Sequence, residues 1–185
     1  MKDDSRPFID INKVNETVEA VKGDRNLAKV TFCMHGKSAG GVALNSQTGA
    51  LIQNGQADEA RRGQFSLLSD EPVPLLGSDR GVSPAEYALN SLASCYTVTL
   101  AAMAAARNIQ LDEINMDLYF DIDLSGFLGV DPNVRNGAQA IRVDVRLKSA
   151  DADEAALQAL VDALPSHSPL HDTLANPVNI MTRRV

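Results

Sequence analysis

Cys95 lies inside a long uncharged stretch, Tyr87 to Ala106, and is the one potentially nucleophilic residue whose surroundings are informative. A cysteine attacks an electrophile as its thiolate, and a free cysteine with a pKa of about 8.5 is only a few per cent ionised at pH 7. Burial in an apolar helix raises that pKa. Cys95 therefore needs a nearby cation, or a hydrogen bond to its anion, before it becomes a useful nucleophile.

Several basic residues could supply that cation. Lys37 and Arg80 are the best candidates by their positions, with Arg61 and Arg62 behind them. Lysine would supply a positive charge, but it cannot make the two parallel hydrogen bonds that the guanidinium of arginine forms with a carboxylate. From the residues alone, a packing role is the favoured interpretation of Cys95, because free cysteines are commonly buried.

The stretch that contains Cys95 has a strong helix-start signal. Ser83 can cap the N-terminus, Pro84 fits the first helical position, and Glu86 falls at the acidic position of a capping box. Apolar residues then recur at three- and four-residue steps: Leu89, Leu92, Tyr96, Leu100 and Met103. The pattern predicts a long helix with the thiol two to three turns from its start.

The segments before this helix have shorter patterns. We predict a helix over Ile9–Val21, strands over Leu27–Met34, Ala50–Gln53 and Gln64–Ser69, turns at Gly36–Gly41 and Asn54-Gly55, and a loop over Glu71–Arg80.

The segments after it alternate more cleanly. Met116–Leu124 has an acidic outward face and Ile141–Leu147 carries outward arginines, so pairing these strands would place opposite charges across the ladder. A helix from Asp151, a short turn after Ser168-Pro169, and a last strand through Val178 and Ile180 complete the chain. This order predicts a single α+β domain.

Composition narrows the class of protein. The 185 residues are 44% hydrophobic, enough for one sizeable core, and the net charge of −7 offers no basic patch for nucleic acid or an anionic membrane. A charged N-terminus without an apolar run predicts no signal peptide, and two cysteines predict a cytoplasmic location. Tyr87–Ala106 is long enough to span a bilayer, but its polar residues favour a buried helix of a soluble protein.

Three motifs together resemble the OsmC/Ohr family, small peroxide-stress proteins that reduce organic hydroperoxides with a cysteine thiol. They are Gly81-x-Ser83-Pro84-x-Glu86, Leu92-Ala93-Ser94-Cys95 and the later Ser168-Pro169. The resemblance divides the chain into a helical extension at residues 1–26 and an OsmC-like domain at residues 27–185. It implies an α+β fold with antiparallel sheets wrapped around a long central buried helix. It also implies an intertwined homodimer, with Cys95 at the interface in the place of the peroxidatic cysteine.

The chain departs from the family's pattern at three positions. The family's peroxidases carry a resolving cysteine just before the late proline, where this chain has Ser168. The hydroperoxide-resistance branch has an acid directly after the helix-opening proline, where this chain has Ala85, and an arginine in the glycine-rich turn, where it offers Lys37. The sequence is therefore closer to the family's less characterised branch. A sulfenic acid at Cys95 would need Cys33 or an external thiol to reduce it, and burial in a strand is the simpler role for Cys33.

The remaining motifs predict no cofactor and no metal. The capping box accounts for Glu86 without acid–base chemistry. His167 and His171 are four residues apart and could share a helical face, but two such ligands without a nearby acid or cysteine make a weak metal site. The Gly36–Gly41 turn lacks the Lys-Ser/Thr ending of a phosphate loop.

Three hypotheses for function stay open. In the first, Cys95 reduces organic hydroperoxides, with Lys37 or Arg80 as activator and an external thiol as reductant. In the second, the protein binds an apolar small molecule non-catalytically in a dimer-interface pocket. In the third, Cys95 is a redox sensor that reports stress to a partner. None of the three involves nucleic acid or a membrane.

Overall fold

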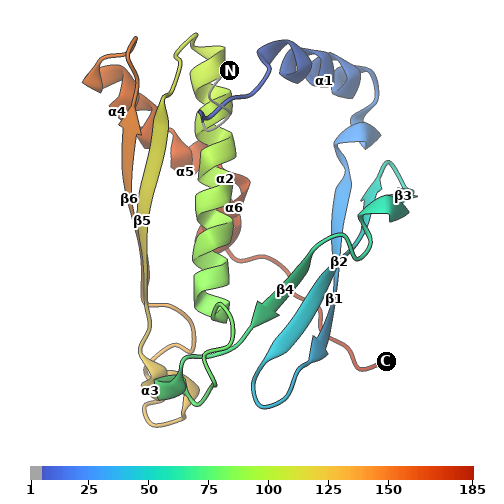
Figure 1. Cartoon of the computed structure of the whole chain (residues 1–185), viewed down its shortest axis with the longest axis vertical. Coiled ribbons are helices and arrows are strands. Elements are labelled where there is room, and N and C mark those ends of the chain that lie inside the picture. The colour runs from blue at the N-terminus through green and yellow to red at the C-terminus, as the bar shows by residue number, and fades with distance from the viewer. Residues whose placement is uncertain (1–5) are drawn as a thin grey trace. The chain divides into compact units, whose positions relative to one another are not determined.

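The computed structural model describes residues 6–185, and the chain forms two compact units. The sheet unit is Asn12–Tyr87, and the helical unit is Ala88–Val185 together with residues 6–11. Figure 1 shows the helices and antiparallel strands of both. The α+β class predicted from the sequence is therefore confirmed. The division expected between residues 26 and 27 stays a prediction.

The sheet unit is a small antiparallel sheet with one helix. Its elements are α1 (Ile11–Gly23, all but its first residue), η1 (Arg25–Ala28), β1 (Val30–Ser38), β2 (Leu44–Gln53), β3 (Gln56–Asp58), η2 (Glu59–Arg61), β4 (Ser66–Ser69) and η3 (Val73–Leu75). The strands β1, β3 and β4 each pair with β2. Asn54 and Gly55 both have positive φ, 50° and 74°, and form the tight β2–β3 turn predicted from the sequence.

Several boundaries in this unit differ from the predicted ones. β1 continues through Gly36 to Ser38, so the turn that follows is shorter than Gly36–Gly41, and β2 already begins at Leu44. Gly36 fits inside the strand because the Leu44 side chain lies over it: a Cβ at Gly36 would be 3.3 Å from Leu44 Cδ1. A glycine inside a strand pattern can therefore mark a close approach, not the end of the strand.

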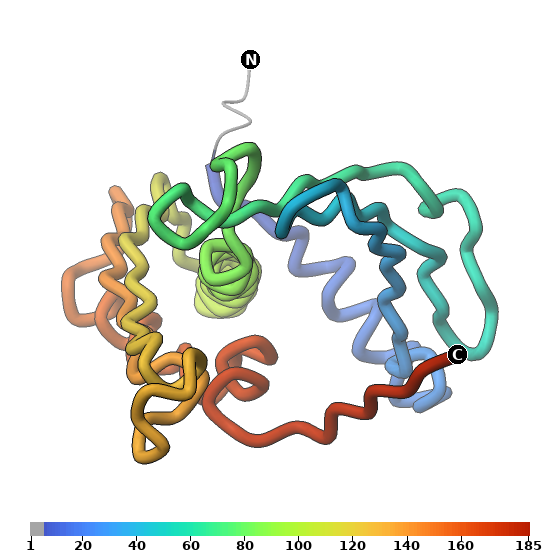
Figure 2. Tube along the Cα trace, turned by 90° about the horizontal axis from the view of Figure 1, so that it is seen from below, coloured from blue at the N-terminus to red at the C-terminus, as the bar shows by residue number. Residues whose placement is uncertain are grey.

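The helical unit is organised by α2 (Pro84–Ala106), which belongs to it from Ala88 onward. Its other elements are β5 (Glu113–Asp121), α3 (Leu124–Phe127), β6 (Ala140–Lys148), α4 (Glu154–Asp162), α5 (Leu164–His167) and α6 (Pro169–Ala175). In Figure 2, where α2 is seen nearly end-on, the β5–β6 hairpin lies on one side of the helix and the last helices on another. The long central helix predicted from the sequence is confirmed.

The β5–β6 hairpin has one apolar face and one charged face because its side chains alternate. Three ion pairs join the two strands on the charged face: Glu113–Lys148 at 2.8 Å, Asp117–Arg146 at 2.7 Å and Asp121–Arg142 at 2.9 Å. The guanidinium of Arg142 also lies 4.6 Å from the centre of the Tyr119 ring. The predicted pairing of opposite charges across this ladder is confirmed.

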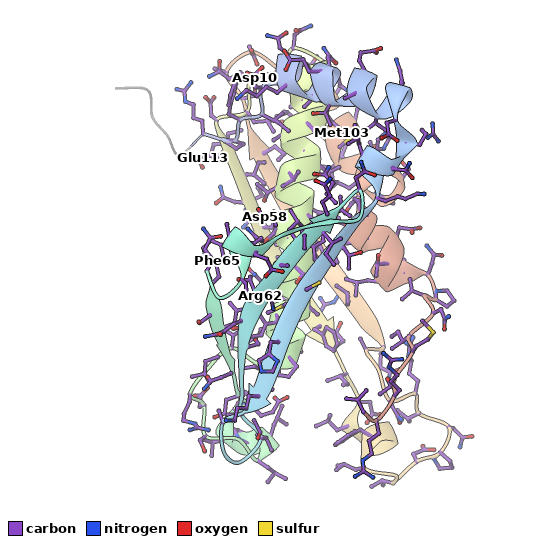
Figure 3. The ribbon with its side chains drawn as sticks, turned by 90° about the vertical axis from the view of Figure 1, so that its right-hand side faces the viewer. Asp10, Asp58, Arg62, Phe65, Met103 and Glu113 are labelled. Carbon is purple, nitrogen blue, oxygen red and sulfur yellow. The ribbon has the colours of Figure 1, made fainter. Side chains whose placement is uncertain are left out.

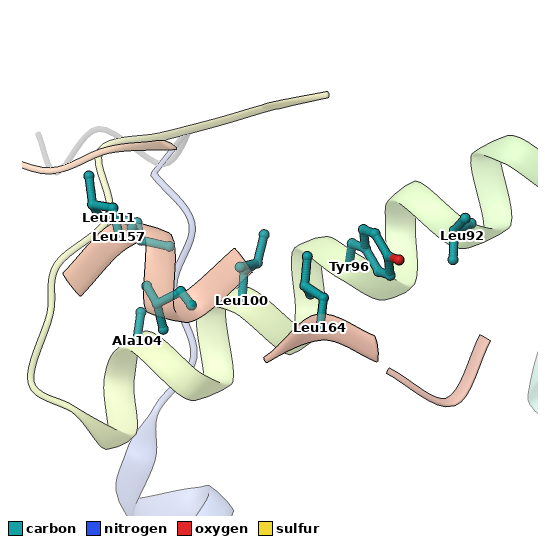
Figure 4. Packing of buried hydrophobic residues seen from close by; sticks show 8 residues of the cluster. Leu92, Tyr96, Leu100, Ala104, Leu111, Leu157 and Leu164 are labelled. Atoms are coloured by element: carbon teal, nitrogen blue, oxygen red, sulfur yellow. The ribbon is translucent and has the colours of Figure 1, made fainter. Parts of the chain in front are cut away.

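The core of the helical unit forms along one face of α2 (Figure 4). Its buried members are Leu92, Tyr96, Leu100, Ala104, Leu111, Leu157, Leu160 and Leu164. Met103, which Figure 3 labels, packs against this cluster from the same helix. Because Cys95 is adjacent to Tyr96 on α2, this packing determines where the thiol lies.

The C-terminal part of the chain corrects three predictions. The helix expected from Asp151 begins at Glu154, because Asp153 caps it by accepting the Ala156 N–H at 2.8 Å. The segment after Ser168, predicted as a turn, is the helix α6. Within the described part of the chain, residues 177–185 contain no strand, so the last strand through Val178 and Ile180 is wrong. Apolar alternation specifies a strand only where a neighbouring strand is available to pair with it.

The N-terminus of α2 is fixed by the predicted capping box, which is confirmed. The Glu86 N–H donates to Ser83 Oγ at 3.2 Å, and the Ser83 N–H donates to Glu86 Oε2 at 2.8 Å. The hydrogen bonds from the backbone and the hydroxyl of Ser83 keep the pKa of Glu86 below its ordinary value, although burial opposes this. Cys95 follows about three turns later on the same helix.

We expect Ser83→Ala to destabilise the protein by about 1 kcal/mol, because the first turn of α2 would lose its side-chain acceptor.

For Glu86→Gln, the loss of stability should depend on pH. The folded-state pKa of Glu86 is lowered, so its stabilisation is present above the unfolded value of about 4.3 and disappears as pH falls through the folded pKa. Urea unfolding across this pH range measures the effect, with Glu16→Gln on α1 as control. A wild-type advantage that persists at low pH contradicts the assignment.

Candidate active site around Cys95

The Cys95 thiol is half-buried on α2 and lies next to Ser168. The Ser168 hydroxyl donates a hydrogen bond to Cys95 Sγ, with 3.2 Å between oxygen and sulfur. Cys95 and Ser168 are 73 residues apart in the sequence. The late Ser-Pro motif noted in the sequence is thus brought directly to the central cysteine.

The position of Ser168 follows from the break between α5 and α6. Pro169 cannot continue α5, but it fits the first position of a new helix. The Ser168 oxygen caps that helix by accepting the His171 N–H at 3.3 Å, and the Ser168 side chain is buried. Because the oxygen accepts from the backbone and the hydroxyl hydrogen points at sulfur, this side chain is held in one orientation.

A second pair of side chains lies beside this contact and was missed by sequence reasoning. The Tyr96 hydroxyl and His171 Nδ1 are 2.6 Å apart, and the two rings are stacked with centroids 6.1 Å apart. Burial raises the pKa of Tyr96, with a further contribution from the neighbouring Cys95. The Tyr96 hydroxyl is therefore a neutral hydrogen-bonding group near neutral pH.

The shared helical face that the four-residue spacing of His167 and His171 would allow is not formed. His167 ends α5 and His171 lies in α6, so the two residues do not share one helical face. His167 Nδ1 is instead 2.9 Å from the Ala163 carbonyl oxygen. Among residues 6–185, no group of three or more histidine, cysteine, aspartate or glutamate side chains could hold a metal ion.

Arg80, a predicted activating cation, makes its contacts with a buried carboxylate in the sheet unit. Asp70 is buried and accepts four hydrogen bonds: one from the Arg80 guanidinium and three from the backbone N–H groups of Glu71, Ser78 and Arg80. Burial would raise the pKa of Asp70, but these hydrogen bonds, that from the Arg80 side chain first, lower it below its ordinary value. Asp70 therefore organises the loop before α2.

Arg80 also connects this loop to the β1–β2 turn. Its second guanidinium nitrogen donates to the carbonyl oxygens of Ala39 at 3.2 Å and Gly40 at 3.0 Å. Both residues belong to the glycine-rich turn that follows Lys37. The contacts give Arg80 a role in positioning this turn.

We expect Asp70→Asn to loosen the β1–β2 turn, because the Arg80 guanidinium would lose its charged partner. Amide hydrogen exchange at Ala39 and Ala43, whose backbones hydrogen-bond across the turn, should accelerate by about tenfold or more. Asp79→Asn makes the same chemical change in the same loop and should leave these rates unchanged. Equal rates in the two variants would contradict the positioning role.

Lys37, the other predicted activator, lies near the end of β1 with its side chain exposed. Over residues 6–185, it forms no ion pair or hydrogen bond through its ammonium group. Lys37 and Arg80 both belong to the sheet unit, whereas Cys95 belongs to the helical unit. An approach of either cation to the Cys95 sulfur stays a prediction.

The two further arginines have partners of their own in the sheet unit. Arg62, labelled in Figure 3, pairs with Glu59 through two hydrogen bonds of 2.6 and 3.2 Å. The guanidinium of Arg61 lies 5.4 Å from the centre of the Phe65 ring.

Cys33 lies half-buried in β1, where the β1–β2 register shifts between Phe32 and Met34. A Cβ at Gly49 would be only 2.7 Å from Cys33 Cβ, so Gly49 makes room for this side chain. The contact gives Cys33 a packing role in the sheet. A resolving role for Cys33 stays a prediction.

Comparison with solved structures shows that this chain has the fold of OsmC-like proteins. An OsmC-like protein from Mycoplasma pneumoniae matches with a TM-score of 0.59 and 18% identity, covering 78% of this chain and 87% of that one. An organic hydroperoxide resistance protein from Legionella pneumophila matches with a TM-score of 0.55 and 14% identity, covering 78% and 88%. A comparison with curated proteins finds no match.

The family follows from the sequence itself. Residues 77–183, more than half of the chain, match the OsmC-like protein family. This protein belongs to that family. Length and composition alone would allow α2 to cross a membrane, and one face of α2 forms the core of the helical unit.

Proposed function

We propose that this protein is a stress-response protein that reduces organic hydroperoxides with the Cys95 thiol. The observation that carries the proposal is the hydrogen bond from Ser168 Oγ to Cys95 Sγ, 3.2 Å long. This donor gives the Cys95 sulfur a polar side-chain partner, and the thiolate form of a cysteine is the species that attacks a peroxide. In support, the Legionella pneumophila protein that shares this fold is an organic hydroperoxide resistance protein.

The proposed reaction transfers one oxygen atom to sulfur. The Cys95 thiolate attacks an oxygen of the hydroperoxide, a sulfur–oxygen bond forms and the oxygen–oxygen bond breaks. The departing alkoxide takes a proton and leaves as the alcohol. Cys95 is thereby oxidised by two electrons to the sulfenic acid, and the hydroperoxide is reduced by two electrons.

The proposed second half of the reaction uses an external thiol. Ser168 cannot form a disulfide, although its side chain is the one beside the Cys95 sulfur. A first external thiol therefore condenses with the sulfenic acid, releasing water and forming a mixed disulfide. A second external thiol then releases the Cys95 thiol and leaves as the oxidised disulfide.

Three further parts of the proposal concern the surroundings of Cys95. The activating cation is Lys37 or Arg80. Lys37 is the freer of the two, because its ammonium has no partner among residues 6–185, whereas Arg80 pairs with Asp70. The working form is a cytoplasmic homodimer with Cys95 at the interface. In support of a dimer, Val98 is exposed on α2 only three residues after Cys95.

Turnover of cumene hydroperoxide in the presence of excess dithiothreitol tests the proposal. We expect steady consumption by the wild type and only the uncatalysed rate for Cys95→Ser. Cys33→Ser is the matched control, because it removes the other thiol, and it should retain turnover.

Other outcomes would each contradict the proposal. Stoichiometric loss of the Cys95 thiol without turnover would indicate a redox sensor. No loss of thiol at high peroxide would indicate a protein that binds an apolar molecule without chemistry. Turnover that survives Cys95→Ser but not Cys33→Ser would place the reaction at the wrong cysteine.

A further inference from the structure

The sheet unit contains an open groove of about 450 Å³ on the strands β1, β2 and β4. Its lining residues are His35, Lys37, Asn45, Ser46, Gln47, Ser66 and Leu67. This volume lies within the range of about 300–1,000 Å³ that is typical of small-molecule sites. None of the lining residues is acidic, although the chain has a net charge of −7.

Strand register places five of the six polar lining residues, all except Ser46, on one face of the sheet. His35 is opposite Gln47, and Gln47 is opposite Ser66 on its other side. Lys37 is opposite Asn45, two residues along each strand. Because directly opposed residues of antiparallel strands project to the same side, and so do residues two apart, the five side chains share one surface.

The side chains on this surface are exposed, and most of them have no hydrogen-bond partner among residues 6–185. Gln47 Nε2 donates to Ser66 Oγ at 3.3 Å. By contrast, the side chains of His35, Lys37 and Asn45 have no hydrogen-bond or ion-pair partner anywhere in residues 6–185. The groove therefore offers the ammonium of Lys37 together with the side-chain amide donors of Asn45 and Gln47.

We propose that this groove binds a small organic carboxylate. A single ammonium matches the single charge of a carboxylate, and charge-assisted hydrogen bonds are the stronger kind. The amide of Asn45 lies opposite Lys37 and can donate to the second carboxylate oxygen. A phosphate dianion would bring a second negative charge without a second permanent cation. The site shares Lys37, a candidate activator, with the proposed peroxide chemistry, but carboxylate binding in the groove does not require Cys95 to react.

Titration of the intact ¹⁵N-labelled protein with hexanoate tests the site. We expect saturable shifts of the Asn45 and Gln47 side-chain amides and of neighbouring backbone amides in β1, β2 and β4. The neutral analogue hexanamide should bind at least about tenfold more weakly. Lys37→Gln should weaken hexanoate binding about tenfold or more, the effect of losing one charge-assisted hydrogen bond.

Two variants separate this site from general effects. Lys29→Gln removes the same charge just before β1 and should bind hexanoate like the wild type. Cys95→Ser should also bind hexanoate unchanged, so the result is independent of whether Cys95 reacts with peroxide. Shifts that do not saturate, equal binding of hexanamide, or equal weakening by Lys29→Gln would overturn the proposal. Tighter binding of inorganic phosphate than of hexanoate would overturn the assignment to a carboxylate.

Discussion

Ser168→Cys is expected to form an intramolecular disulfide with Cys95 when the protein is oxidised by an alkyl hydroperoxide. In the wild type, the Ser168 oxygen is 3.2 Å from Cys95 Sγ, and its hydrogen bond points directly at the sulfur. A disulfide requires about 2.05 Å between sulfurs, and the longer carbon–sulfur bond of cysteine brings the new atom nearer. The introduced thiol would therefore attack a sulfenic acid at Cys95 before an external thiol could reach it.

The expected readout is a change from a trappable sulfenic acid in the wild type to a nearly stoichiometric disulfide in the variant. Thiol titration and intact mass under non-reducing conditions measure it, and dithiothreitol should reverse it. Ser166→Cys, on the exposed side of α5, is the matched control and should form no such disulfide. A persistent sulfenic acid in Ser168→Cys would show that residue 168 is not placed to meet the oxidised sulfur.

Leu100→Ala is expected to destabilise the protein by about 3 kcal/mol, through lost apolar burial and the cavity that remains. Leu100 is fully buried at the centre of the cluster that α2 shares with α4 and α5. The same cluster contains Tyr96, the direct neighbour of Cys95. Loosening it should therefore also slow the reaction of Cys95 with peroxide, because the contact with Ser168 depends on this packing.

Chemical denaturation measures the loss of stability, and Val98→Ala provides the comparison. Val98 lies on the same helix but is 62% exposed, so its truncation should change the free energy of unfolding by no more than about 0.5 kcal/mol. Equal stability of the two variants would contradict this prediction, because it would mean that the buried face of α2, which carries Leu100, does not stabilise the protein.

The parts of the fold that local chemistry specifies could be predicted from the sequence. The capping box at Ser83 and Glu86 depends on residues three positions apart, so its hydrogen bonds follow from spacing alone. The β5–β6 hairpin could also be predicted, because its period-two pattern and its charges both favour the same strand pairing. The Asn54-Gly55 turn belongs to the same group, since its residue types tolerate positive φ.

The parts that depend on distant partners could not be predicted from the residues. The contacts Ser168–Cys95 and Tyr96–His171 join positions 73 and 75 residues apart, and no local pattern encodes them. The four-residue spacing of His167 and His171 suggests one helix, whereas Pro169 divides the segment into two. The prediction of a last strand is wrong for a related reason: the alternation near Val178 does not indicate which strand would pair with it.

The central claim is that the Cys95 sulfur is the atom that reacts with an organic hydroperoxide. Its most direct test is peptide mapping after one equivalent of cumene hydroperoxide, with dimedone present to trap sulfenic acid. The account predicts a dimedone adduct on Cys95 and an unmodified Cys33. No adduct on Cys95, or an adduct mainly on Cys33, would contradict it.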